Sequence, residues 1–254
     1  SRCTFDVLVV DQTPPMLVCP GNLQAECTSP DGAIVSYPPP VVADECDADP
    51  IVICNPAPGS LFPMGTTTVT CRATDDSGNS MECTFTVTVA DTLPPQITCP
   101  ADKIVECVSP YGTRVEYAAT AIDSCDPLVA IECIPPSGSF FPVGSNSVEC
   151  VATDSSGNEG RCTFVISVVD TKPPTVTCPA SVLAECQSSN GTPVTFTATA
   201  ADDCRGAVDV VCLPPSGSVF PQGTTRVTCT ATDPSGNTGR CEFDVTVADT
   251  TPPT

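Results

Sequence analysis

Residues 69–89 read VTCRATDDSGNSMECTFTVTV, and this stretch decides the fold. Apolar residues alternate with polar ones from Val69 to Ala73 and again from Cys83 to Val89. Such a period of two is typical of half-buried β-strands. Between the two arms, residues 74–79 read TDDSGN, in which Asp, Ser, Gly and Asn each favour a turn. The stretch therefore predicts a β-hairpin centred near Ser77.

The hairpin belongs to a repeat that is marked by cysteines. Six of them recur with a period of 79 or 80 residues. The three sets are Cys19, Cys27, Cys46, Cys54, Cys71 and Cys83; Cys99, Cys107, Cys125, Cys133, Cys150 and Cys162; and Cys178, Cys186, Cys204, Cys212, Cys229 and Cys241. Cys3 precedes Cys19 by the same 16 residues that separate Cys83 from Cys99. It therefore predicts the end of a preceding repeat.

The period predicts how the chain is divided. We expect the last strand of a preceding repeat at 1–10, complete repeats at 11–90, 91–169 and 170–248, and a joint to a following repeat at 249–254. Each repeat holds six or seven short strand-like runs between Pro-rich connections, with no helical periodicity. This pattern predicts an all-β chain of tandem immunoglobulin-like β-sandwiches. Three disulfides in each repeat would reinforce its thin core.

Composition narrows the class of protein. Nineteen cysteines indicate an oxidising compartment, so we expect an extracellular protein, secreted or at the cell surface. The closest cysteine pairs are eight residues apart, whereas zinc knuckles use shorter spacings. A net charge of −21 argues against nucleic acid and anionic membranes as partners, and no apolar run is long enough for a spanning helix. Without histidine the usual general base is missing, so we expect no enzyme and no required cofactor.

Motifs shared by the three repeats carry a resemblance to a known family. Each repeat has Val-x-Cys-x-Ala-Thr-Asp-x-Ser-Gly-Asn followed by Cys-x-Phe, and a Phe-Pro-x-Gly turn before them. The segments are 69–79, 148–158 and 227–237 for the first motif, and 62–65, 141–144 and 220–223 for the turn. With its Val-x-Asp-x-x-Pro-Pro joints, essentially the whole chain resembles the hyalin repeat (HYR) family. The resemblance implies an immunoglobulin-like fold in extracellular tandem arrays associated with adhesion, without a catalytic motif.

Fifteen connectivities are open to six cysteines, and topology ranks them. In an immunoglobulin-like sandwich the strand carrying Cys54 lies beside the strand carrying Cys71, and the loops near Cys46 and Cys83 share one end. Cys19 and Cys27 are then left as a local clasp, while Cys71–Cys83 is the main alternative. The predicted pairs are Cys19–Cys27, Cys46–Cys83, Cys54–Cys71, Cys99–Cys107, Cys125–Cys162, Cys133–Cys150, Cys178–Cys186, Cys204–Cys241 and Cys212–Cys229. Cys3 is expected to bond an upstream repeat, at the counterpart of Cys46.

The joints between repeats read Asp-x-x-Pro-Pro, and double proline makes a short, stiff connector. The joint aspartate should face acidic and amide side chains of the next repeat, which are the ligands that Ca²⁺ requires. The candidate ligands are Asp11, Asp44, Asp47, Asp75, Asn79, Asp91, Asp123, Asp126, Asp154, Asn158, Asp170, Asp202 and Asp233. In the alternative, the Asp of each Asp-x-Ser-Gly-Asn motif only caps its turn. Arg205 replaces the aspartate of the other two repeats and weakens the third site.

Two function classes remain after these exclusions. In the first, repeats or identical chains join head to tail as an extracellular rod or filament. In the second, the chain is an adhesion module that binds a protein or glycan, with Tyr111 and Arg114 as the only candidate contacts. Asn190-Gly191-Thr192 is an N-glycosylation sequence in a loop, so Asn190 is the predicted glycan site.

Overall fold

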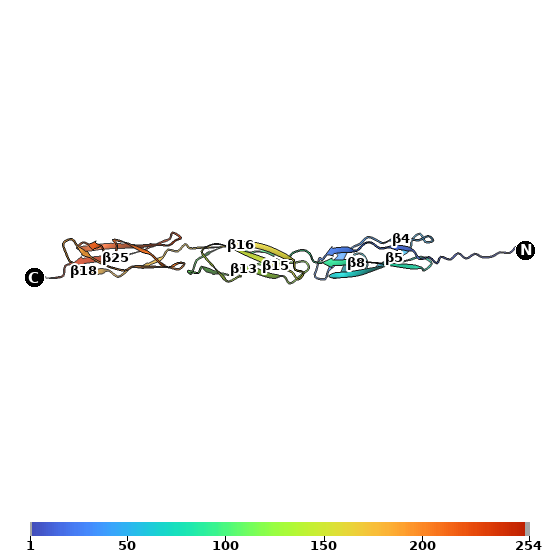
Figure 1. Cartoon of the computed structure of the whole chain (residues 1–254), viewed down its shortest axis with the longest axis horizontal. Helices are drawn as coiled ribbons and strands as arrows, with labels where there is room; N and C mark the ends of the chain where they lie inside the picture. Colours follow the sequence, from blue (N-terminus) through green and yellow to red (C-terminus); the bar gives the residue numbers. More distant parts are fainter. Residues whose placement is uncertain (1, 252–254) are drawn as a thin grey trace. The chain divides into compact units, whose positions relative to one another are not determined.

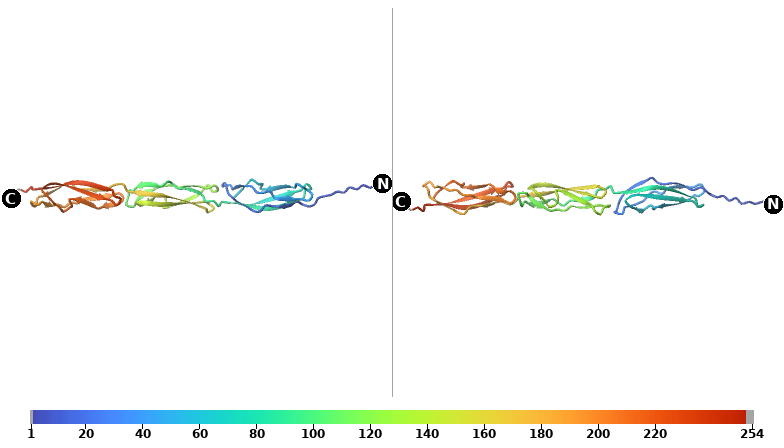
Figure 2. Two further views of the ribbon diagram at one scale, coloured as in Figure 1. Left: turned by 90° about the horizontal axis from the view of Figure 1, so that it is seen from above. Right: turned by 60° about the horizontal axis from the view of Figure 1, so that its bottom comes forward.

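The structure, a computed structural model, describes residues 2–251, and it contains tandem β-sandwiches (Figures 1 and 2). The all-β tandem-repeat prediction is confirmed by the strands and sheets of the chain itself. The chain packs as two compact units: Ser1–Thr98 with Ala119–Glu132 and Cys150–Cys162, and Cys99–Ala118 with Cys133–Glu149 and Thr163–Thr254. Each unit holds one joint between consecutive repeats. Among the described residues, no helix is long and apolar enough to cross a membrane.

The first sandwich is built from one four-stranded sheet and two short strand pairs. The sheet has the order β2-β8-β7-β5, and the pairs are β1-β4 and β3-β6. The strands are β1 (Met16–Val18), β2 (Leu23–Glu26), β3 (Ala33–Val35), β4 (Val41–Ala43), β5 (Ile51–Asn55), β6 (Ser60–Phe62), β7 (Gly65–Thr74) and β8 (Ser80–Ala90). β2 runs parallel to β8, whereas the other pairs are antiparallel.

The second repeat has strands at the equivalent sequence positions. They are β9 (Gln96–Thr98), β10 (Lys103–Glu106), β11 (Thr113–Val115), β12 (Thr120–Ile122), β13 (Ala130–Ile134), β14 (Ser139–Phe141), β15 (Gly144–Thr153) and β16 (Glu159–Val169). Here again the early strand β10 pairs in parallel with the last strand, β16.

The third repeat contains the same sheet and one additional strand. Its strands are β17 (Thr175–Thr177), β18 (Val182–Glu185), β19 (Thr192–Pro193), β20 (Thr199–Asp202), β21 (Gly206–Val208), β22 (Val210–Leu213), β23 (Val219–Phe220), β24 (Gly223–Thr232) and β25 (Thr238–Ala248). The sheet order is β18-β25-β24-β22. The additional strand β21 follows Arg205 and extends the β17-β20 pair.

The hairpin predicted from residues 69–89 is confirmed as β7 and β8. Cys71 lies opposite Cys83 and Val69 opposite Phe85 in the antiparallel register. Gly78 has a φ of 88° in the connecting turn, a conformation that side chains with a Cβ rarely adopt. Apolar residues of both strands point into the core because side chains alternate between the faces of a strand.

The Phe-Pro-x-Gly motif supplies the largest fully buried side chain of each repeat. Phe62, Phe141 and Phe220 are among the most deeply buried residues, with exposed fractions of 0%, 1% and 1%. In addition, two aromatic rings pack edge to face in each sandwich, as shown by Tyr37 and Phe85, whose ring centroids are 4.9 Å apart. The core is thus a narrow layer of valines and aromatic rings between the four-stranded sheet and the short strand pairs.

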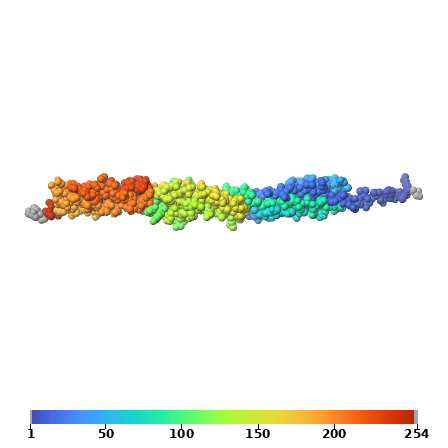
Figure 3. Space-filling view, in the orientation of Figure 1, coloured from blue at the N-terminus to red at the C-terminus, as the bar shows by residue number. Residues whose placement is uncertain are grey.

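Residues 2–10 do not form a strand in this structure. Phe5, Leu8 and Val9 are exposed at 83%, 86% and 89%, and the segment lies as a thin extension of the chain (dark blue in Figure 3). The prediction that it is the last strand of a preceding repeat remains a prediction, because that strand needs neighbours outside this chain.

Removing the buried aromatic ring should destabilise the third repeat. We expect Phe220→Ala to cost about 3–5 kcal/mol through lost burial and the cavity left behind. The neighbouring Val219 is 60% exposed, so Val219→Ala is the matched control and should change stability by less than about 0.5 kcal/mol. Native-state hydrogen exchange of β24 and β25 amides measures both. A cost below about 1 kcal/mol for Phe220→Ala would contradict the assigned core.

Candidate functional site: the joints between repeats

The connector between the first two repeats is hydrogen-bonded to both of them. On one side, the backbone N–H and the hydroxyl of Thr92 donate to the Glu26 carboxylate at 2.7 and 2.6 Å. On the other side, the side-chain amide of Asn158 donates to the carbonyl oxygen of Asp91 at 3.3 Å. The hydrogen bonds from the Thr92 hydroxyl and backbone lower the pKa of Glu26. This connector is therefore docked at both ends.

The second connector repeats these contacts. Thr171 donates to the Glu106 carboxylate at 2.9 and 2.8 Å, and Asn237 donates to the carbonyl oxygen of Asp170 at 3.1 Å. Hydrogen bonds from the Thr171 backbone and hydroxyl lower the pKa of Glu106. The Asp-Thr-x-Pro-Pro sequence thus has a defined role, in which its Thr binds the preceding repeat and its Asp binds the following one.

A disulfide crosses each of these joints. Cys27 of the first repeat bonds Cys125 of the second, and Cys107 of the second bonds Cys204 of the third. The Cα atoms are 5.9 and 5.7 Å apart, within the usual range for a disulfide. The cysteine framework therefore links consecutive repeats as well as closing each one.

These bonds correct several predicted pairs. Cys19 bonds Cys83 instead of Cys27, and Cys178 bonds Cys241 instead of Cys186. The physical reason is the parallel pairing of β2 with β8, which carries Cys27 to the end of the sandwich, where its N–H donates to the carbonyl of Ala90. The wrong pairs are Cys19–Cys27, Cys46–Cys83, Cys99–Cys107, Cys125–Cys162, Cys178–Cys186 and Cys204–Cys241.

Two predicted pairs are present as expected. Cys54 bonds Cys71 and Cys212 bonds Cys229, in each case between residues that lie opposite each other on paired strands. The alternative Cys71–Cys83 bond does not form, although those residues are also cross-strand neighbours. In the second repeat Cys99, Cys133, Cys150 and Cys162 are all disulfide-bonded, and the pair Cys133–Cys150 stays a prediction.

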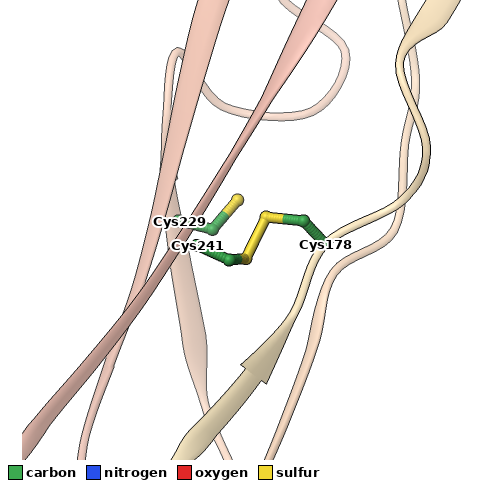
Figure 4. Close-up of side chains that lie close together, drawn as sticks. All are labelled: Cys178, Cys229 and Cys241. Carbon is green, nitrogen blue, oxygen red and sulfur yellow. A yellow bond between two sulfur atoms is a disulfide. The ribbon is translucent and has the colours of Figure 1, made fainter.

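The internal disulfides lie close together in the core. Figure 4 shows the bond between Cys178 and Cys241 with the sulfur of Cys229 beside it. Because Cys229 is itself bonded to Cys212, none of these sulfurs is a thiolate that could bind a metal. This cluster is a structural staple between the sheet and the first strand of the repeat.

Carboxylates gather beside the first internal joint. Oxygens of Asp91, Asp123 and Asp154 lie within 4.8 Å of one another. Asp91 is only 8% exposed, and its Oδ1 is buried without a hydrogen-bond partner. Burial raises the pKa of Asp91, and the negative charges of Asp123 and Asp154 raise it further. A recess of about 430 Å³ adjoins Asp91 and Asp123. This is an acidic pocket with an unsatisfied ligand atom.

The other two clusters differ from each other. At the start of the first repeat, Asp11, Asp44 and Asp75 form an equivalent group. In the third repeat, the described residues bring together Asp170, Asp202 and the bonded Cys204, so this group has two carboxylates. The hydroxyl of Ser235 donates to the Asp170 carboxylate at 3.1 Å. The third cluster is therefore the least suited to a cation.

The remaining predicted ligands brace the loops. Asp47 and Asp126 accept the backbone N–H groups of Asp76 and Ser155 at 3.0 and 2.7 Å. Hydrogen bonds from backbone and serine groups lower the pKa of Asp126. Arg205 has no carboxylate to replace this contact.

The turn motif has both of its expected roles. Asp154 accepts the backbone N–H of Asn158 at 2.8 Å and its side-chain amide at 2.9 Å, and the same carboxylate lies beside Asp91. Asp233 accepts the equivalent pair of bonds from Asn237. Asn79 likewise donates its side-chain amide to Asp75. Asp75, Asp154 and Asp233 therefore cap their turns, as the alternative interpretation expected.

Asn190 is exposed in the turn between β18 and β19. Its backbone N–H donates to the hydroxyl of Ser188 at 3.3 Å. The position is accessible, and the glycan stays a prediction that intact-mass measurement would test.

Together, these observations define a repeat protein whose distinctive chemistry lies in disulfide-linked, acidic joints. The HYR domain family matches residues 10–89, 90–168 and 169–247, so the chain belongs to this family. This is a non-catalytic repeat family, and membership of it confirms the prediction that the chain is not an enzyme.

The relatives share the repeat over the whole chain. It is 37% identical to hyalin of Strongylocentrotus purpuratus over 99% of its own length and 22% of the relative's. It is 34% identical to hyalin of Lytechinus variegatus, over 99% and 50%. A rat protein, sushi, von Willebrand factor type A, EGF and pentraxin domain-containing protein 1, is 30% identical over 91% and 7%. The chain thus spans half or less of the length of these relatives.

Cadherin ectodomains are among the structurally similar proteins. Mouse cadherin-23 EC22-24 matches with a TM-score of 0.35 and 15% identity, covering 93% of this chain and 99% of that one. Human CDH23 EC21-23 matches with a TM-score of 0.37 and 17% identity, covering 92% and 100%. These scores are too low to support a functional comparison.

The cost of the buried Asp91 charge is open to measurement. In buffer with a chelator at pH 7, we expect Asp91→Asn to melt at a higher temperature than the wild type, because the amide carries no charge. The folded-state pKa of Asp91 is raised, so the wild type loses stability as the pH rises through that pKa and the carboxyl becomes charged. The difference between the variant and the wild type should therefore vanish near pH 3. Asp76→Asn, in an exposed turn position, is the control. A less stable Asp91→Asn protein at pH 7 would contradict the account.

Proposed function

We propose that the chain is a segment of an extracellular structural rod or filament, secreted or at the cell surface, whose repeats are fixed end to end. The observation that carries the proposal is the disulfide across each joint, Cys27–Cys125 and Cys107–Cys204. A joint of this kind has two covalent links, the chain itself and the disulfide, so bending or pulling it strains both. A tethered binding domain needs only one.

The composition and the relatives support the same function. Disulfides persist in oxidising compartments, and the 19 cysteines of this chain fit a protein that is secreted or at the cell surface. The hyalins of two species align with the whole chain, and their greater length leaves room for further repeats. A long array of identical joints is the arrangement in which a covalent link at every joint has most effect on stiffness.

Ca²⁺ at the acidic joints is a second part of this proposal. Ca²⁺ takes six to eight oxygen ligands, including carboxylates, backbone carbonyls and water. Asp91, Asp123 and Asp154 supply carboxylates, and the partnerless oxygen of Asp91 is the atom that a cation would satisfy. The residues present therefore fit the ion at the first internal joint, and the Asp11, Asp44 and Asp75 group fits it too. A bound cation would neutralise repulsion and tighten the joint.

Solution scattering tests the rod. Strands of ten or eleven residues give each repeat a length of about 35 Å. Three repeats in line then predict a radius of gyration of about 30 Å, against about 18 Å for a compact chain of this length. The oxidised protein should give the larger value, and the double variant Cys27→Ser, Cys125→Ser should show a broader distribution of dimensions. A wild-type radius near 18 Å would reject the rod.

Thermal melts with added calcium test the cation. We expect Ca²⁺ to raise the melting temperature of the wild type and Asp123→Asn to reduce that shift, because one carboxylate of the site is lost. The variant keeps an oxygen for the N–H groups of Cys125 and Asp126 that Asp123 now accepts, so its turn should survive. Asp76→Asn, outside the cluster, should keep the full shift. An identical calcium response in wild type and Asp123→Asn would exclude the site.

A further inference from the structure

Among the residues that the structure describes, three cysteines have no disulfide partner: Cys3, Cys46 and Cys186. Each is the equivalent of a bonded cysteine in another repeat. Cys46 occupies the position of Cys125 and Cys204, which receive a bond from the preceding repeat. Cys186 occupies the position of Cys27 and Cys107, which send a bond to the following one.

Cys46 is held in the geometry of its bonded equivalents. Its N–H donates to the Asp44 carboxylate at 2.8 Å, and the N–H groups of Cys125 and Cys204 donate to Asp123 and Asp202 at 2.7 and 2.8 Å. The same Asx turn therefore presents the sulfur in all three repeats. Cys46 is exposed, whereas Cys204 is buried against the repeat that bonds it.

Cys186 is prepared in the same way at the other end. Its N–H donates to the carbonyl oxygen of Ala248 at 2.9 Å, as that of Cys27 does to Ala90 at 2.9 Å. Thr250 donates to the neighbouring Glu185 carboxylate at 2.8 and 2.5 Å, reproducing the bonds of Thr92 to Glu26. The third repeat therefore has the same hydrogen bonds around Cys186 as the first repeat has around the bonded Cys27.

A recess beside Cys46 indicates which segment could bind there. It has a volume of about 450 Å³ and is lined by Thr13, Pro14, Met16, Ala43, Asp44 and Glu45. The equivalent residues line the recess at the first internal joint, where the Glu26-Cys27-Thr28 segment of the preceding repeat forms the remaining wall. The recess at Cys46 could therefore accept a Glu-Cys segment from another repeat. Glu185-Cys186 is such a segment of this chain, at the position equivalent to Glu26-Cys27.

We propose that Cys46 and Cys186 are the two halves of further inter-repeat disulfides, with Cys186 bonding the Cys46 position of the next HYR repeat. This proposal rests on the proposed end-to-end function. It adds the direction in which repeats join and the disulfide bond that joins them. The partner is the matching end of another repeat of this kind, and a second copy of this chain supplies it. Each joint then carries one disulfide in one direction along the array.

The bond forms by oxidation of two thiols. Each sulfur loses a proton and one electron as the S–S bond forms, and a disulfide oxidant accepts the two electrons and two protons and becomes two thiols. Oxidised glutathione or an enzyme of the disulfide-exchange class serves as that oxidant.

The same equivalence reassigns Cys3. It corresponds to Cys83 and Cys241, which bond the cysteine at the start of their own repeats, Cys19 and Cys178. The expected partner of Cys3 is therefore the counterpart of Cys19 in a preceding repeat. This replaces the counterpart of Cys46, which is the partner predicted from the sequence. Cys3 takes no part in the joint bond and is replaced by serine in the experiment.

The experiment mixes two capped chains. Cys46→Ser and Cys186→Ser are each made in a Cys3→Ser background and incubated with reduced and oxidised glutathione. We expect the Cys3→Ser protein to form a ladder of head-to-tail multimers on non-reducing gels, and each capped variant to lose the ladder. An equal mixture should give a dimer and nothing longer, and its peptide map should contain the Cys46–Cys186 cross-link.

Two results would overturn the proposal. In one, the mixture stays monomeric with both thiols still titratable. In the other, Cys46–Cys46 and Cys186–Cys186 links form as readily as the mixed one. Circular dichroism checks folding, and Cys46→Ala and Cys186→Ala repeat the test. Scattering from the chain with serine at 3, 46 and 186 separates the two claims. If the mixture fails to cross-link while this triple variant is extended, only the disulfide is rejected, whereas a compact triple variant rejects the rod.

Discussion

The parallel pairing of β2 with β8 is the constraint on which the joints depend. It aligns Glu26 with Ala90 at the last position of both strands, so that Cys27 and the connector leave the sandwich at the same end. From there Glu26 binds Thr92 and Cys27 reaches Cys125. The third repeat keeps this register, with Glu185 opposite Ala248. A single strand register thus positions the hydrogen bonds and the disulfide of every joint.

The inter-repeat disulfide also changes the energetics of the array. Cys27 and Cys125 are 98 residues apart, and closing a loop of this length removes about 4.7 kcal/mol of entropy from the unfolded chain on the chain-entropy model. The 17-residue separation of Cys54 and Cys71 corresponds to about 3 kcal/mol. The longest loops are those that span two repeats, so unfolding one repeat is coupled to the stability of its neighbour. The buried charge of Asp91 lowers the stability of the joint, unless a cation or a proton neutralises it.

The sequence predicts most of the fold because its signals are local. Period-two alternation around Cys71 and Cys83 predicts the hairpin, and the equal spacing of cysteines predicts the repeats. The acidic joint is also foreseeable, since Asp91 is followed by a stiff Pro-Pro connector that brings the next repeat close. The structure adds that Asp47 and Asp126 brace loops instead of joining the carboxylate clusters.

The disulfide partners could not be predicted in the same way. Spacing shows where cysteines lie along the chain, and a bond depends on which strands are neighbours. Nothing in the short run Leu23–Glu26 indicates a parallel partner 64 residues away. In the structure, the remaining two cysteines of each repeat, Cys27 and Cys46 in the first, lie in loops at opposite ends of the sandwich, so they are better placed to reach neighbouring repeats than each other.

The most direct test of the account is the disulfide map of the oxidised protein, digested without reduction and analysed by mass spectrometry. The account predicts peptides that join Cys27 to Cys125 and Cys107 to Cys204, which connect different repeats. Peptides that join Cys19 to Cys27 and Cys99 to Cys107 would contradict it, because each repeat would then be closed on itself and the joints would have no covalent link beyond the chain.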